Sequence, residues 1–429
     1  MAKSHSLLMA SLILVITTAC ASSGSQAPQV QEEVVKPSEP MTLTMLQDGA
    51  TISDEEFETM IAAPVKAKYP HITVQIVRNT KGADGLSNLI SGGSFPDFMF
   101  TTYPQIKIHR ELGTAYDMTS LIKTYKMDIG KFDPAAMETS RVYGGNEGMY
   151  AVPFSLNFLA LFYNKDIFDM FGVTYPKEGM TWDETVNLAK NFSRTAGGVE
   201  YKGIMIPGIG DLITQLSLPY VNATTNKAAI NSDGWNKVFQ LIKAVNEIPG
   251  NKGATLDHFL KTQTLAMIPT YDARFAALEK LQGTPSQFNW DITQFPSYTE
   301  RPNTSLASSG HFLLVSALSK HKEEAFEVIN LLTSEANQNL ITEHGRFTSL
   351  NNEQIKNKYG MNMKSMQGKN IKAVFNSKFA PPFPPTKYDK FATPHLTAAV
   401  KSVIDGELDV NSAIRRAEEA FNKDIEANK

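Results

Sequence analysis

The sequence predicts an α/β fold with two domains, and two observations lead to this prediction. Short apolar segments alternate with helix-like segments in the first part of the chain, and residues 41–46, 72–77 and 98–100 have the character of strands. Such a β-α-β-α-β order implies a mainly parallel sheet with right-handed crossovers. The chain has 429 residues, more than one hydrophobic core usually supports, so two domains are expected.

The first helix is expected to begin after Ser53. Ser53 and Glu56 have the spacing of a capping box, in which the side chain of each residue accepts a hydrogen bond from the backbone amide of the other. Three apolar residues then follow at helical spacing: Phe57, Ile61 and Val65. Pro64 is expected to kink this helix because proline has no amide hydrogen. A second, short helix is expected at residues 86–90.

Polar residues follow each of the three early strands. They occupy residues 47–48, 78–79 and 101–103. Ligands of open parallel sheets bind beyond the carboxyl ends of the strands, so these segments are candidate ligand-binding loops. A solvated turn is the alternative for each of them.

The rest of the chain continues the alternation. Strands are expected at residues 158–163, 264–268, 290–296 and 311–315. Helices are expected after the capping box of Thr181 and Glu184 and at residues 235–245, 323–332 and 412–425. The proline-rich segment 379–388 is expected to be irregular. No tryptophan is expected to stack on a ligand: Trp182 belongs to the helix-start motif, Trp235 is expected to pack from a helix, and Trp290 is expected in the core at a strand start.

Three short motifs follow one another in residues 148–192. They are YAVP at 150–153, LFYNKDIF at 161–168 and TWDE at 181–184. In order and spacing they resemble the segment of bacterial extracellular solute-binding proteins, the sugar-binding family that includes maltose-binding protein, where the chain crosses between two lobes. The resemblance implies a two-lobe periplasmic-binding fold, in which each lobe is a mainly parallel sheet with flanking helices and a multi-crossing hinge joins the lobes.

The same resemblance gives the expected domain limits. The N-terminal lobe would consist of residues 41–155 and 310–350, and the C-terminal lobe of residues 156–309 and 351–429. The chain would cross between the lobes near residues 155–158, 307–313 and 348–352. Several crossings would let the hinge bend as a unit, because each strand absorbs part of the rotation.

The N-terminus resembles a lipoprotein signal. Lys3 precedes an apolar run at residues 7–16, which is too short to span a bilayer but has signal-peptide length. Cys20 is the only cysteine of the chain, and Thr17 stands where such signals usually have leucine. The resemblance implies that residues 1–19 are a signal peptide and that Cys20 becomes the acylated first residue of the mature chain. A plain secretory signal with a free thiol is the alternative.

Residues 20–40 are expected to form a flexible tether. Glycine, serine, proline and glutamine dominate this segment, and no aromatic residue could anchor it to a core. The sequence has no apolar stretch of the length needed for a transmembrane span.

Charge and motif content exclude several function classes. The net charge is −3, so the chain lacks the basic character that nucleic-acid binding requires. The 8 histidines are scattered without metal-ligand spacing, so neither a metal nor another cofactor is expected. We find no nucleophile elbow and no phosphate-binding loop, and therefore expect a binding protein that is not an enzyme.

The family resemblance also places the ligand site. It implies ligand contacts at residues after the third strand, at the first crossing, after the strand at 264–268, at the second crossing and in the C-terminal region. These residues are Thr102, Tyr103, Asn157, Tyr271, Arg274, Ser309, His311 and His395. Relatives commonly have a tryptophan near Tyr271; this chain lacks it, so either Tyr271 serves as the aromatic platform or the platform is absent. A packed or capping side chain is the alternative for every one of these residues.

The resemblance implies a lipid-anchored, extracytoplasmic substrate-binding component of an ABC importer. It would act as a monomer, capture a small-molecule solute that is expected to be a carbohydrate, and deliver it to permease subunits in the membrane. A non-sugar solute such as an anion, an amine or an iron complex is the first alternative, and Arg274 in the cleft would favour an anion. A secreted glycan-acting enzyme and a binding lobe for a sensor kinase are further alternatives.

Overall fold

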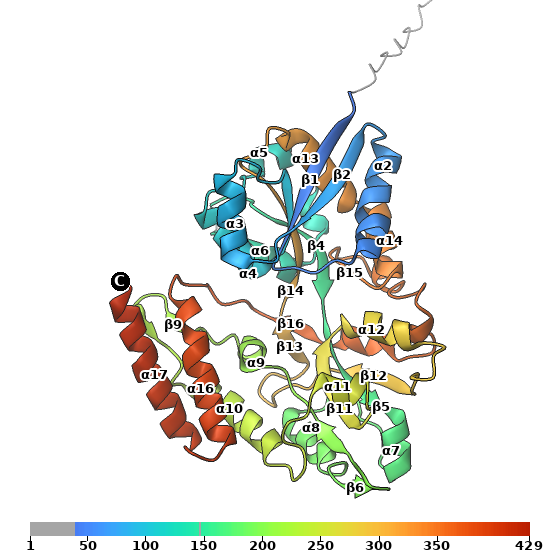
Figure 1. Ribbon diagram of the computed structural model, residues 1–429, viewed down its shortest axis with the longest axis vertical. Coiled ribbons are helices and arrows are strands. Elements are labelled where there is room, and N and C mark those ends of the chain that lie inside the picture. The colour runs from blue at the N-terminus through green and yellow to red at the C-terminus, as the bar shows by residue number, and fades with distance from the viewer. Residues whose placement is uncertain (1–38, 146) are drawn as a thin grey trace, which may run out of the picture. The chain divides into compact units, whose positions relative to one another are not determined.

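The computed structural model describes residues 39–145 and 147–429, so Cys20, the signal peptide and nearly all of the tether lie outside the described residues. Pro40–Lys429 forms one compact unit. Within it, two sheets each carry their own helices, and we call them the first and second lobe (Figure 1).

The first lobe has a six-stranded sheet. Its strands, in spatial order, are β15 (Phe347–Thr348), β4 (Val152–Asn157), β14 (Ser309–Val315), β3 (Phe98–Thr102), β1 (Met41–Asp48) and β2 (Ile72–Arg78). β1 pairs in parallel with β2 and β3, as expected. The pairs β3–β14, β14–β4 and β4–β15 are antiparallel. The expectation of a mainly parallel sheet is therefore wrong for this half, because β14 and β15 return from later parts of the chain against the direction of their neighbours.

The helices of the first lobe cover both faces of this sheet. They are α1 (Asp54–Phe57), α2 (Ala63–Lys68), α3 (Gly82–Ser91), α4 (Tyr103–Glu111), α5 (Thr119–Thr124), α6 (Pro134–Gly144), α13 (Lys322–Leu332), α14 (Glu335–Glu343) and α15 (Glu353–Lys356). Figure 1 shows α3, α4 and α6 on one face and α2 and α14 on the other. Strand alternation matches this: Leu43 and Met45 of β1 pack with the α2 face, whereas Leu46 packs with the α3 face.

The first helix begins as expected and then departs from α geometry. Ser53 and Glu56 form both hydrogen bonds of the capping box, and Phe57, Ile61 and Val65 are buried. A π-helical turn, Glu58–Ala62, separates α1 from α2 and precedes Pro64. The wider turn accommodates a residue that cannot donate a backbone hydrogen bond, so the expected effect of Pro64 takes the form of a π segment.

The second lobe has a four-stranded sheet. Its strands, in spatial order, are β12 (Trp290–Gln294), β5 (Leu159–Asn164), β11 (Leu265–Tyr271) and β8 (Lys202–Ile204). β5 is antiparallel to both β11 and β12, and only β11–β8 is parallel. A mainly parallel sheet is therefore wrong here as well. Three two-stranded pairs complete it: β13 (Thr304–Ala307) with β16 (Lys378–Ala380), β9 (Val221–Asn222) with β10 (Lys227–Ala228), and β6 (Thr195–Ala196) with β7 (Val199–Glu200).

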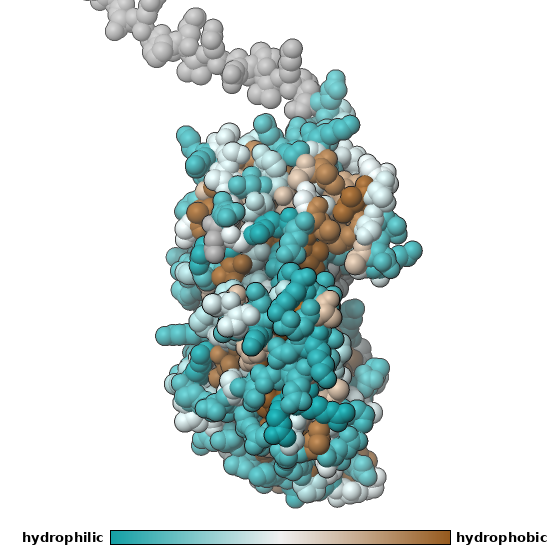
Figure 2. All heavy atoms as spheres, turned by 90° about the vertical axis from the view of Figure 1, so that its left-hand side faces the viewer, coloured by the Kyte–Doolittle hydropathy of each residue, from teal (hydrophilic) through white to brown (hydrophobic). Residues whose placement is uncertain are grey.

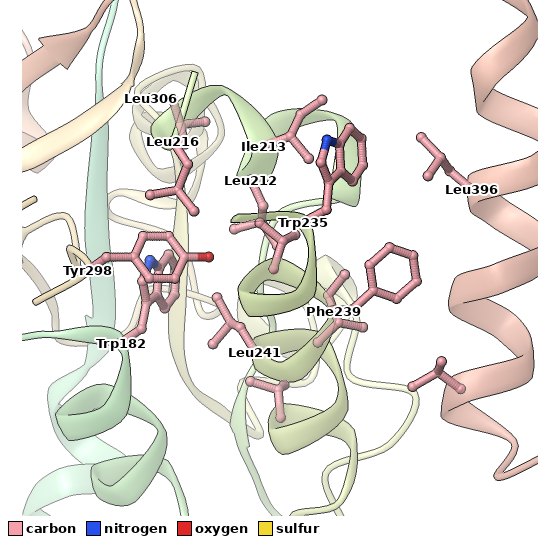
Figure 3. Packing of buried hydrophobic residues seen from close by; sticks show 14 of the residues in the cluster. Trp182, Leu212, Ile213, Leu216, Trp235, Phe239, Leu241, Tyr298, Leu306 and Leu396 are labelled. Atoms are coloured by element: carbon pink, nitrogen blue, oxygen red, sulfur yellow. The ribbon is translucent and has the colours of Figure 1, made fainter. Parts of the chain in front are cut away.

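The helices of the second lobe enclose a large aromatic core. They are α7 (Lys165–Phe171), α8 (Trp182–Ala189), α9 (Ile209–Gln215), α10 (Asp233–Asn246), α11 (Leu256–Leu260), α12 (Arg274–Leu281), α16 (Ala392–Ile404) and α17 (Val410–Ala427). Figure 3 shows Trp235 and Phe239 of α10 directed toward α16, where Leu396 lies. Trp235 and Trp290 are buried, as expected, and Trp182 is buried as well.

The chain passes between the two sheets several times. It leaves the first sheet after Asn157 and returns to it at Ser309. Ile355 still packs in the first-lobe core, whereas Tyr359 joins a cluster with Phe158 and Phe347 that spans both sheets. The residue limits of the lobes and of the crossings stay a prediction.

Large apolar side chains are exposed on both lobes. Figure 2 shows hydrophilic residues over most of the lower part of one face and apolar residues gathered in its upper part. Ile108 and Leu112 of α4 are among the large apolar residues exposed to solvent. In the described part of the chain, no helix is both long and apolar enough to cross a membrane.

Candidate functional site

A cavity of about 400 Å³ lies where the two lobes meet at the crossing strands. Its walls come from the loop after β1, the ends of β3 and β4, the start of α12, and residues 344–346 before β15. Five of the expected site residues line it: Thr102, Asn157, Tyr271, Arg274 and His311. The fold thus brings together side chains that are far apart in the sequence, and we call this cavity the crossing pocket.

The backbone itself shapes this pocket at Gly310. A Cβ atom at this position would lie 2.2 Å from the backbone oxygen of Ser155. Only glycine allows β14 to approach β4 this closely without displacing it. The close approach sets the positions of His311 and Asn157 on the two neighbouring strands.

Two expected residues lie beside the crossing pocket. Ser309 begins β14 and accepts a hydrogen bond of 3.5 Å from the Asn157 amide. Tyr103 is the first residue of α4, not part of a loop, and its ring packs edge-on against Tyr143 with a centroid distance of 4.8 Å. Ser309 therefore contacts a residue of the pocket, whereas Tyr103 packs on a residue outside the pocket lining.

His395 does not join this group. It lies on α16, and its Nε2 atom is 2.7 Å from the carboxylate of Asp424 on α17. It lines a different cavity, between these two helices. The proline-rich segment ends before α16 begins, so a residue placed by proximity to that segment becomes part of a helix pair instead.

The polar residues after β1 and β2 mostly contact one another. Asp48 is buried and accepts a hydrogen bond of 2.7 Å from the Asn79 amide. Arg78 donates to Gln47 and to Asp54, which lies 2.5 Å away. Of the three candidate loops, only the one containing Thr102 contributes its expected residue to the crossing pocket.

Arg346 organises one wall of the pocket. Its Nε and Nη2 atoms donate to the two carboxylate oxygens of Glu56 at 2.8 and 3.0 Å, and Nη2 also donates to the Thr51 backbone oxygen at 2.8 Å. Burial alone would raise the pKa of Glu56, but Arg346 and Ser53 more than offset it, so the pKa lies below its ordinary value. The guanidinium thus ties the segment before β15 to the start of α1.

Arg346 also fixes the protonation state of His311. Its Nη1 atom lies 3.1 Å from His311 Nδ1, and the Ser155 hydroxyl lies 2.9 Å from the same nitrogen. A guanidinium can only donate, so Nδ1 accepts and the imidazole proton resides on Nε2. Burial, assisted by the charge of Arg346, lowers the pKa of His311 well below its ordinary value. His311 is therefore a neutral donor with a fixed tautomer.

The start of α12 contributes two charged residues with different surroundings. Asp272 is buried, and this burial raises its pKa to about 7 although Arg346 acts in the opposite direction. Arg274 is half-buried, and its Nε atom is buried without a hydrogen-bond partner among the described residues. Burial also lowers the pKa of Arg274.

Four tyrosines gather next to the crossing pocket: Tyr103, Tyr143, Tyr220 and Tyr271, which we call the tyrosine group. Burial, followed by the charge of Asp211, raises the pKa of Tyr103 to about 12. Burial also raises the pKa of Tyr143, with Tyr103, Asp389 and Tyr220 adding to the effect. Because these electrostatic partners come from both lobes, the two lobes face each other across the group.

Two carboxyl groups accompany the tyrosines. Asp211 accepts a hydrogen bond of 2.8 Å from the Tyr271 hydroxyl, and burial raises its pKa. Asp389 accepts a hydrogen bond of 2.6 Å from the Thr386 hydroxyl, and burial raises the pKa of Asp389 as well. Aromatic faces combined with carboxylate acceptors can bind the ring faces and hydroxyls of a sugar.

Several of these residues were not predicted from the sequence. Tyr143, Tyr220, Asp211, Asp389 and Arg346 come from separate segments, and no local pattern marks them. The one available signal was for Asp211, which stands in the first turn of α9, where the helix dipole favours an acidic residue. No group of three or more potential metal ligands occurs in the part of the chain that the structure describes.

Comparison with known proteins identifies solute-binding proteins both by sequence family and by fold. The family model for the bacterial extracellular solute-binding protein matches residues 50–339. Among solved structures, an ABC substrate-binding protein of Listeria monocytogenes in complex with cycloalternan has a TM-score of 0.71 at 20% identity, covering 90% of this chain and 99% of that one.

Two further structures are similar to the same extent. The sugar-binding protein MalE of Xanthomonas citri has a TM-score of 0.69 at 16% identity, covering 90% of this chain and 98% of that one. A solute-binding protein of Thermotoga lettingae bound with α-D-tagatose has a TM-score of 0.68 at 20% identity, and the match covers 90% of this chain and 100% of that one. These structures show the expected two-lobe periplasmic-binding fold, here built with mixed sheets.

Proposed function

The chain belongs to the bacterial extracellular solute-binding protein family, and we propose that it captures a carbohydrate between its lobes for delivery to an ABC importer. The structural relatives include proteins described with cycloalternan and with α-D-tagatose.

The tyrosine group is the observation that carries this proposal. A tyrosine offers a flat apolar face for a sugar ring and a hydroxyl at its edge. Asp211 and Asp389 lie among these rings and can accept hydrogen bonds from sugar hydroxyls. In the adjoining pocket, Asn157 supplies both a donor and an acceptor, which suits a hydroxyl that needs both.

Two further parts of the proposal rest on the sequence. We propose that Cys20 carries acyl chains that hold the protein at the outer face of a membrane, because the N-terminus has the order of a lipoprotein signal. We also propose that the protein acts as a monomer and meets permease subunits there. One acyl chain gives only marginal anchoring, so more than one is expected.

Calorimetry on the purified chain tests carbohydrate capture. Neutral and acidic mono- and oligosaccharides are titrated into the protein, and the same mixtures are then analysed for cleavage. Saturable binding without cleavage supports a binding protein. Cleavage of the glycan would instead identify a glycan-acting enzyme, and the absence of binding to every carbohydrate would refute the proposed solute class.

Three alanine variants test the site itself. Asn157→Ala and Tyr271→Ala are expected to weaken binding by roughly tenfold or more, since each removes a hydrogen-bonding or stacking group. Tyr201→Ala is the matched control, because Tyr201 is a half-buried tyrosine of the second lobe that packs on Phe171 outside the crossing pocket. If both site variants bind as well as the control, the assigned contacts are wrong.

A further inference from the structure

We propose that the solute carries a carboxylate and that Arg274 binds it, so that the carbohydrate is a uronic acid or an oligosaccharide containing one. This inference rests on the proposed function and deepens it. Two arginines line the crossing pocket, and they differ in their partners: Arg346 is paired with a carboxylate of the protein, whereas the Nε atom of Arg274 has no hydrogen-bond partner among the described residues.

Arg346 is the basic residue of the pocket whose charge is compensated. Both carboxylate oxygens of Glu56 accept hydrogen bonds from it, and the Thr51 backbone oxygen accepts another. Glu56 thus occupies the edge of the guanidinium formed by Nε and Nη2, which a ligand carboxylate would need for a bidentate pair. Arg346 is therefore unsuited to bind an anionic solute directly.

Arg274 is the basic residue of the pocket without such a partner. Its Nε atom is buried and makes no hydrogen bond among the described residues. Burial lowers the pKa of Arg274. The nearby buried acid, Asp272, interacts electrostatically with Arg346. A half-buried guanidinium with an unpaired donor is costly unless a bound group supplies the missing acceptor.

The neighbouring donors fit an acceptor-rich ligand. His311 lines the same pocket and, with Nδ1 occupied by Arg346 and Ser155, can offer only the Nε2 hydrogen. The Asn157 amide adds further donors. A planar guanidinium matches the two oxygens of a carboxylate, which a neutral hydroxyl cannot do.

The two parts of the site then imply an orientation for the sugar. Tyr271 belongs to both, since it lines the crossing pocket and bonds Asp211 in the tyrosine group. Asp211 and Asp389 would repel a carboxylate but accept hydrogen bonds from hydroxyls. The carboxylate of the sugar therefore lies toward Arg274 and its ring hydroxyls toward the tyrosine group.

The test compares acidic sugars with their neutral counterparts. Galacturonate and glucuronate, and their oligosaccharides, are titrated by calorimetry beside galactose, glucose and neutral oligosaccharides of equal length, at two salt concentrations. The parent chain is expected to bind the acidic member of each pair roughly 10- to 100-fold more tightly, as a charged hydrogen-bonded pair provides. This preference should shrink at the higher salt concentration.

Three variants locate the effect. Arg274→Gln should weaken binding of the acidic sugars at least tenfold more than binding of their neutral counterparts, so that the preference is lost. Arg274→Lys should keep part of the preference because the charge remains. Arg415→Gln, at an exposed position of α17, is the matched control and should bind like the parent. A thermal melt like that of the parent shows that a variant is folded.

The outcomes separate this inference from the proposed function. Tight binding of neutral sugars with no preference for acidic ones overturns the role of Arg274 and leaves carbohydrate capture standing. An equal loss of acidic and neutral binding in Arg274→Gln also overturns it, because the residue would then support the pocket and not the carboxylate. Failure to bind any carbohydrate refutes both.

Discussion

Replacing Arg346 with glutamine should destabilise the first lobe. The guanidinium makes two hydrogen bonds to Glu56, one to the Thr51 backbone oxygen and one to His311 Nδ1. These bonds join the segment before β15 to three other parts of the lobe. Glutamine is too short to reach all of them and carries no charge.

The magnitude follows from the exposure of the two charged side chains. The Arg346 side chain is 12% exposed and that of Glu56 is 31% exposed. Breaking a fully buried pair costs about 3–5 kcal/mol, whereas an exposed pair contributes about 0–1 kcal/mol. A pair that solvent partly reaches lies between these limits, so Arg346→Gln should lower the free energy of unfolding by about 2 kcal/mol.

Urea unfolding followed by far-ultraviolet circular dichroism measures this loss. All three tryptophans lie in the second lobe, so circular dichroism is needed to follow the first. Lys261→Gln is the control, since Lys261 forms an exposed pair with Asp257 and should change stability by less than about 0.5 kcal/mol. Adding Glu56→Gln completes a double-mutant cycle, in which the two side chains should show a coupling of about 1 kcal/mol or more.

Acid should reduce the difference between Arg346→Gln and the parent. The pKa of Glu56 is depressed in the folded chain, so its contribution is complete above the ordinary glutamate pKa and is lost as the pH falls through the folded value. A loss of stability no larger than that of the control, or a coupling near zero, would show that Arg346 does not hold these segments together.

Three further predictions concern the core, a buried acid and the N-terminus. Trp235→Ala should lower the free energy of unfolding by about 3–5 kcal/mol in denaturant titrations, because Trp235 is fully buried. Trp235→Phe should lower it by less, and an equal loss in the two variants would argue that Trp235 is not tightly packed. The pKa of Asp272 is raised to about 7, so the folded chain retains a proton that the unfolded chain releases, and stability should fall as the pH rises from about 4 to about 7 by at most about 4 kcal/mol. Asp272→Asn should remove this part of the pH profile, and an unchanged profile would contradict the assignment. Cys20→Ser should release the protein from the membrane fraction, and its retention after a high-salt wash would count against lipidation.

Local patterns in the sequence predicted much of the fold. The capping boxes of Ser53 and Thr181 form as expected, because each depends on residues only three positions apart. Strands and amphipathic helices lie close to their expected limits, since periodicity records which side of a segment is buried. The sequence also gave the correct family through short motifs in a fixed order.

The tertiary structure decided strand direction and the make-up of the site. β14 pairs antiparallel with β3, and β15 pairs antiparallel with β4, although these partners lie far apart in the sequence. The sequence of a strand does not show which strand will be its partner. Arg346 and Glu56 are 290 positions apart, and the tyrosine group draws on four separate segments. Such contacts depend on how the helices and strands pack against one another, and the spacing of apolar residues carries no information about this packing. A helix cap or an apolar face, in contrast, is determined by residues that are close together in the sequence.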